Sequence, residues 1–120
     1  NWVLPPLVVV VKANNSLTFL HHSLNLIYHI FNLGVQFNIV IIVRDSDNYY
    51  QTTYNVVSEL VRQFDTKMIS NNQSSPIITI LRADNLSPQE VKYLISTSSL
   101  VLDSVKGNLA AQINVEFNKI

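Results

Sequence analysis

The chain has no cysteine among its 120 residues, and it has only two glycines. The absence of cysteine excludes disulfide bonds, thiolate metal sites, cysteine nucleophiles and dithiol redox chemistry. It leaves the compartment unassigned, because a cysteine-free domain can occupy any redox environment. Loops that bind phosphate use glycines to bring backbone amides close to the anion. The residues directly after the first apolar run are Lys12-Ala13-Asn14-Asn15, with no glycine among them. The sequence therefore excludes a P-loop and a standard dinucleotide-binding fingerprint.

Charge is also scarce, since Asp, Glu, Lys and Arg make up 13% of the chain, against about a quarter in ordinary soluble domains. The formal net charge is zero, and no run of lysine or arginine is present, so nucleic acid is not favoured as a partner. The apolar stretches are far shorter than the roughly 20 residues that cross a bilayer, so we expect no transmembrane segment.

The length of the chain suits one domain with a single core. We therefore interpret residues 1–120 as a single domain, and the missing start methionine favours a fragment or a module of a larger protein or assembly. Hydrophobic residues make up 48% of the chain. Together with the low charge, this composition predicts that a protein partner, a second copy or further chain covers part of the surface.

Short apolar runs that alternate with helical patterns are the main positive signal. The runs are Leu7–Val11, Phe37–Val43 and Ile77–Leu81, and Leu100–Leu102 is a fourth candidate strand. Continuous β-branched runs of this kind are typical of strands that helices cover on both faces. The predicted fold is therefore three-layer α/β, with a mainly parallel sheet of four to five strands and helices on both faces.

Three helices are predicted between these strands. The first carries an apolar stripe from Leu17 to Phe31 and ends at Gly34, where a helix cap needs positive φ. The second begins near Asp47, and Lys67–Ile69 after it is predicted to form a short extra strand. The third starts at Ser87-Pro88-Gln89-Glu90, which has the pattern of a capping box with proline at the first helical position. The tail fits either a hairpin strand or a helix.

Acidic residues gather at the carboxyl ends of the predicted strands. They are Asp45 and Asp47 after the second strand, Asp84 after the third and Asp103 at the fourth. Parallel strands bring these ends to one edge, where ligands bind, and carboxylate oxygens can hold a divalent metal for phosphoester chemistry. Aspartate is also common in turns and helix caps for local reasons, and we prefer that interpretation.

Two resemblances to known families arise at the same residues. Pro6–Leu20 resembles the opening strand and helix of family-2 glycosyltransferases, and Val43–Asp47 resembles the end of their second strand. Leu81–Pro88 resembles their metal-binding Asp-x-Asp segment, which would imply a metal site near Asp84. Here Arg82 stands where the first metal aspartate of that segment belongs. The order of strand, asparagine, helix, strand and late aspartate is also similar to PIN-like nucleases, but Lys12 replaces their first aspartate. No family membership is assigned on these partial matches.

The preferred functional hypothesis is a non-catalytic structural or protein-interaction domain that is part of a larger assembly. The apolar circumference of the first helix predicts an interface on this helix and the segments near it. We assign to this interface Leu26, Ile30 and Leu33 of the helix together with Trp2 and Tyr49. No cofactor and no catalytic residue is predicted. The alternative is a metal-dependent or degenerate enzyme that acts on phosphoester or nucleotide-sugar substrates at the carboxyl edge of the sheet.

Overall fold

The computed structural model describes residues 4–12, 17–44, 50–74 and 76–104. Within these ranges four parallel strands form one sheet in the order β3-β2-β1-β4. The elements in chain order are β1 (Leu4–Lys12), α1 (Leu17–Asn32), β2 (Phe37–Arg44), α2 (Tyr50–Ser70), β3 (Ile78–Arg82), the short 3₁₀ turn η2 (Ala83–Asn85), α3 (Pro88–Ser96) and β4 (Leu100–Asp103). The α/β class, the parallel sheet and the helices on both faces agree with the sequence-based prediction.

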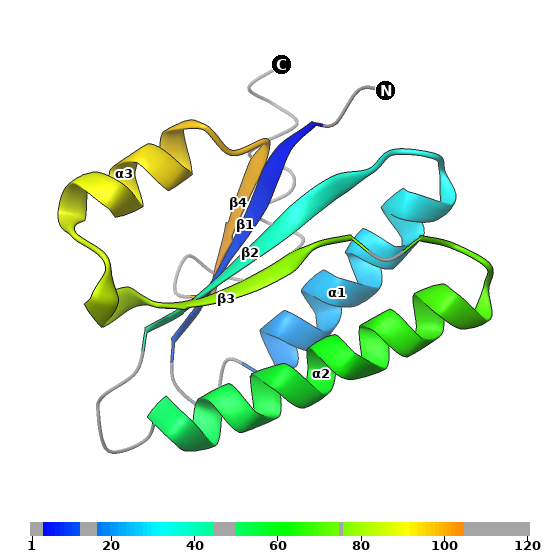
Figure 1. Cartoon of the computed structure of the whole chain (residues 1–120), viewed down its shortest axis with the longest axis horizontal. Coiled ribbons are helices and arrows are strands. Elements are labelled where there is room, and N and C mark those ends of the chain that lie inside the picture. Colours follow the sequence, from blue (N-terminus) through cyan, green and yellow to red (C-terminus); the bar gives the residue numbers. More distant parts are fainter. Residues whose placement is uncertain (1–3, 13–16, 45–49, 75, 105–120) are drawn as a thin grey trace.

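Helices α1 and α2 cover one face of the sheet, and α3 covers the other (Figure 1). Alternate strand residues such as Val9 and Ile41 point toward α1 and α2 and form the main core with Leu20 and Ile27. The residues between them, including Val8, Val10 and Ile42, form a smaller core under α3. The β-branched runs of β1 and β2 are therefore continuous because each residue has an apolar layer to face.

The ends of α1 and α2 are set by residues in the left-handed region. Gly34 follows α1 at φ +93°, as the sequence predicts. Asn72 follows α2 at φ 59°, and the amide of Gln73 donates to the carbonyl oxygen of Met68. Asparagine is one of the few residues other than glycine that adopt this conformation readily.

One predicted element is wrong. Lys67–Ile69 is not a strand but the last turn of α2, which continues to Ser70. Met68 is completely buried there and extends the stripe of Val57 and Phe64 by another turn. The tail, which fits either a hairpin strand or a helix, lies outside the described residues, as does Asp47, near which the second helix is predicted to begin.

The strand order creates a change of direction beside β1. The chain moves from β1 to β2 and then β3 on one side, and α3 returns it to the other side of β1 as β4. In open α/β sheets, the carboxyl ends of the strands at such a switch point border the ligand-binding crevice. The fold therefore places the carboxyl ends of β1, β2 and β4, together with α3, around one candidate site.

Candidate functional site

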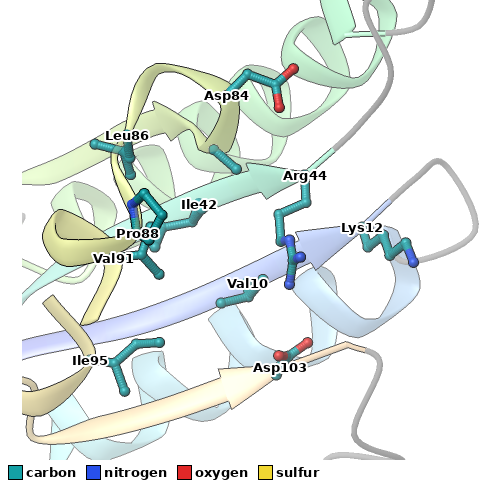
Figure 2. Close-up of a pocket in the computed structure, with 11 residues that line it drawn as sticks. Val10, Lys12, Ile42, Arg44, Asp84, Leu86, Pro88, Val91, Ile95 and Asp103 are labelled. Carbon is teal, nitrogen blue, oxygen red and sulfur yellow. The ribbon is translucent and has the colours of Figure 1, made fainter.

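A cleft of about 670 Å³ lies between α3 and the carboxyl half of the sheet. Its lining residues come from β1, β2, η2, α3 and β4, and Figure 2 shows them: Val10, Lys12, Ile42, Arg44, Ala83, Asp84, Leu86, Pro88, Val91, Ile95 and Asp103. The volume is within the roughly 300–1,000 Å³ that is typical of small-molecule pockets. The cleft coincides with the switch point of the sheet.

The walls of the cleft are apolar. Val10 and Ile42 form its floor on the sheet, and Val91 and Ile95 project from α3 above them (Figure 2). Leu94 of α3 packs against the smaller core and holds the helix on the sheet. Because no residue of α3 is fully buried, space remains between the helix and the strands.

Two charged side chains face each other at the open end of the cleft. Arg44 from the end of β2 and Asp103 from the end of β4 point toward one another across β1 (Figure 2). Asp103 is buried, whereas Arg44 is exposed. Arg44 forms no ion pair with any carboxylate of the described residues. Its exposed guanidinium is directed into the mouth of the cleft (Figure 2).

Lys12, at the end of β1, is the second cation of the cleft rim. Its backbone amide donates to Ser104 Oγ at 3.2 Å, which joins the ends of β1 and β4. Its side chain extends outward from the strand end rather than over the apolar floor (Figure 2). Lys12 and Arg44 thus bring positive charge to adjacent strand ends.

Asp84 and Arg82 are directed away from the cavity. Arg82 follows the alternation of β3 toward α2, where its guanidinium lies 4.4 Å from the ring centroid of Tyr50. An Arg82 nitrogen is 3.6 Å from a carboxylate oxygen of Asp84, which points out of the cleft in Figure 2. Burial raises the pKa of the Tyr50 phenol, and the neighbouring Tyr54 adds to this shift. These contacts connect the end of β3 to the start of α2.

The structure brings two of the predicted metal ligands to one edge. Asp84 and Asp103 both line the cleft, while Asp45 and Asp47 lie outside the described residues. Within the described ranges, no three His, Asp or Glu side chains gather closely enough to hold a metal ion. The metal assignment of the four aspartates remains a prediction.

The predicted interface residues have different environments. Leu33 is 82% exposed, whereas Leu26 and Ile30 are half-buried and Ile30 packs on the main core. Trp2 and Tyr49 lie outside the described residues. Among the three described members of this set, Leu33 is thus the one that presents a large apolar surface to solvent.

Sequence reasoning did not identify Arg44, Val91 and Ile95 as residues of one site. A signal was present for Arg44, which follows Val40 and Ile42 at spacings of two residues and so shares their face of the strand. What the sequence did not reveal is which face α3 would cover. That depends on α3 crossing to the opposite side of the sheet from α1 and α2.

No protein-family model matches the chain, and no curated protein is significantly similar to it in sequence. None of the helices in the described part of the chain is both long and apolar enough to span a bilayer.

Proposed function

We propose that this domain binds a small molecule in the cleft between α3 and the carboxyl edge of the sheet. The observation that carries the proposal is the combination of an apolar cleft of about 670 Å³ with the side chain of Arg44 at its mouth. Apolar walls with a few convergent polar groups are typical of ligand pockets. The position at the switch point of a parallel sheet supports the same conclusion.

The test is a ligand-observed NMR screen of a fragment library against the wild-type protein and a variant with a filled cleft. Val91→Trp places an indole in the space between α3 and Ile42. We expect fragments that bind the wild-type protein to lose their saturation-transfer signals with this variant, because the indole occupies their volume.

Lys92→Trp is the matched control. Lys92 is the next residue on the same helix, is exposed and does not line the cleft. Its substitution adds the same indole while leaving the cavity open, so binding should persist. If no fragment binds the wild-type protein, or if Val91→Trp and Lys92→Trp bind the same fragments equally well, the proposal is wrong.

A second proposed function is protein interaction, the hypothesis preferred from the sequence. It is favoured by large apolar side chains at the edge of the sheet opposite the cleft: Leu33 is 82% exposed, Ile77 68% and Ile69 66%. They lie in or beside the α1–β2 and α2–β3 connections, which are on the same side of the molecule (Figure 1). A hydrogen bond between Asn32 and Gln73 joins these connections. Exposed apolar groups of this kind often mark binding surfaces.

We expect the isolated domain to self-associate at micromolar concentration through these side chains, with little dependence on salt. Sedimentation velocity of the wild-type protein and of Leu33→Ser tests this, because Leu33 is the most exposed large apolar side chain of the described residues. Val56→Ser is the control, since Val56 is an exposed apolar residue on α2. A wild-type protein that remains a soluble monomer at high concentration and binds no hydrophobic dye would count against the interaction function.

A further inference from the structure

We propose that the cleft selects a small organic anion with an apolar body, whose anionic group binds Arg44. This inference rests on the proposed small-molecule function and specifies its ligand class. It requires two different contacts in one ligand, a charged contact at the mouth of the cleft and an apolar contact farther in.

The charged contact follows from the position of Arg44. The residue ends β2 on the α3 face of the sheet, and its side chain extends over β1 into the mouth of the cleft (Figure 2). It makes no ion pair within the described part of the chain. A guanidinium presents a planar set of donors that matches two oxygens of a carboxylate, phosphate or sulfonate. An anion at this position would have a bidentate partner.

The other charged residues that line the cleft are Lys12, Asp84 and Asp103, and their directions decide which of them a ligand would meet. The side chains of Lys12 and Asp84 both point outward from the cavity, and the Asp84 carboxylate lies near Arg82 (Figure 2). Of the two acids that line the cleft, Asp103 is the one whose carboxylate points toward Arg44, and it lies at the β4 side (Figure 2). Repulsion from Asp103 would keep an anionic group on the β2 side, close to Arg44.

The apolar contact follows from the walls. Val10 and Ile42 on the sheet face Val91 and Ile95 on α3. Val10 and Ile42 are already buried, so the apolar surface that still faces water belongs mainly to Val91, which is half-buried, and Ile95, which is exposed. A bare inorganic anion would leave that surface in water, so it would gain only the contact to Arg44. A neutral apolar molecule would bury the walls and leave the guanidinium without a partner. A ligand with both an anionic group and an apolar body would make the contact to Arg44 and the contact to the apolar walls at once.

The amino terminus of α3 does not supply the anion contact. The amide of Glu90 donates to Ser87 Oγ at 3.1 Å, and the amide of Ser87 donates to the Glu90 carboxylate at 3.0 Å. The capping box thus already satisfies these two amides and places a negative charge at the helix start. Selectivity for an anion therefore depends on side chains at the strand ends.

The experiment compares three probes by fluorescence titration and calorimetry. They are 8-anilinonaphthalene-1-sulfonate, its uncharged counterpart N-phenyl-1-naphthylamine, and inorganic sulfate. The first two share the same aromatic body and differ in the sulfonate. We expect the wild-type protein to bind the sulfonate dye more tightly than the neutral dye, and to bind sulfate far more weakly than either.

Arg44→Gln should lower the affinity for the sulfonate dye by about tenfold or more, because a charge-assisted contact is lost. Its affinity for the neutral dye should be unchanged. Arg62→Gln is the matched control, because Arg62 is an exposed arginine on α2, paired with Glu59 on the opposite face of the sheet. That variant should bind both dyes as the wild-type protein does. Melting temperatures of both variants check that they remain folded.

The outcomes separate this inference from the proposed function. If both dyes bind and Val91→Trp displaces them, but Arg44→Gln changes neither affinity, the cleft binds small molecules without selecting anions and this inference is wrong. If Leu33→Ser abolishes dye binding while Val91→Trp and Arg44→Gln leave it intact, the dyes occupy the opposite edge and both proposals are wrong. Sulfate binding as tight as that of the sulfonate dye would overturn the requirement for an apolar body.

Discussion

At the start of α3, two side chains bind backbone amides that the helix cannot satisfy itself. Ser87 Oγ accepts from the amide of Glu90, and the Glu90 carboxylate accepts from the amide of Ser87. Pro88 fills the first helical position, where the missing amide costs nothing. These local contacts matter for the cleft because they fix the end of α3 that adjoins Leu86 and Val91.

Ser87→Ala should lower the free energy of unfolding by about 1 kcal/mol, the usual effect of losing a helix cap. Urea denaturation followed by circular dichroism measures this change. Ser74→Ala, an exposed position in the loop before β3, serves as the control and should have little effect. Equal stability of Ser87→Ala and the wild-type protein would show that the cap does not stabilise α3.

The Glu90 carboxylate makes the cap dependent on pH. The hydrogen bond from the Ser87 amide lowers the pKa of Glu90 below its ordinary value of 4.5. A lowered folded-state pKa means that the charge stabilises the fold above the ordinary value, and that this contribution is lost as pH falls through the folded value. Glu90→Gln should therefore be less stable than the wild-type protein at pH 7, and the difference should shrink below about pH 4. A difference that stays constant from pH 7 to pH 3 would contradict this assignment.

At the scale of elements, the two faces of the sheet are packed to different degrees. Helix α1 buries Leu20, Leu24, Ile27, Tyr28 and Phe31 against the strands. Helix α3 has no fully buried residue and touches the smaller core through Leu94. The well-packed face stabilises the fold, and the loosely packed face provides the cleft.

Leu24→Ala should lower the free energy of unfolding by roughly 2–5 kcal/mol, because Leu24 is 4% exposed and its truncation leaves a cavity. Leu94→Ala is the matched substitution on α3 and should cost less, since Leu94 is only half-buried. Parallel urea denaturation curves give both values. A larger cost for Leu94→Ala than for Leu24→Ala would mean that the face under α3 carries more of the stability than its burial indicates.

At the scale of the whole molecule, the strand order brings separate segments to one site. Residues of β1, β2 and β4 meet at the carboxyl edge although they are far apart in the sequence. The same edge collects Lys12 and Arg44 along with Asp84 and Asp103. The balance of these charges decides between a metal site and an anion site.

We expect no rise in melting temperature when millimolar Mn²⁺ or Mg²⁺ is added. Lys12, Arg44 and Arg82 bring positive charge to the edge that holds the carboxylates, which opposes cation binding. A bound metal would stabilise the folded state by mass action, so differential scanning fluorimetry is a sensitive test. A clear rise with Mn²⁺ that Asp84→Ala abolishes would support the metal-dependent enzyme instead.

Much of the fold could be predicted because its signals are local. The uninterrupted run Leu7–Val11 predicts a strand covered on both faces, Gly34 predicts the end of α1, and Ser87-Pro88 predicts the start of α3. The prediction of an extra strand at Lys67–Ile69 is wrong. Met68 continues the helical spacing of Val57 and Phe64, and its burial on the main core extends α2 through these residues.

The candidate site was only partly predictable. Placing Asp84 and Asp103 at one edge requires only that the strands be parallel. Identifying Arg44 as the cation at the mouth of the cleft requires knowing on which face of the sheet each strand-end side chain lies, and which face α3 covers. Asp84 also shows the limit of strand-end reasoning, because its side chain is directed to Arg82 and away from the cavity.

The sequence by itself determined the α/β class, the alternation of the four strands with three helices, and the chemistry excluded by two glycines and no cysteine. These properties depend on contacts between neighbouring residues or on composition. The tertiary structure decided that α3 crosses to the face opposite α1 and α2, and that its few apolar contacts leave a cleft beside Arg44 and Asp103. The reason is physical: a helix pattern specifies which residues are buried, but the side of the sheet and the closeness of packing depend on all the elements together.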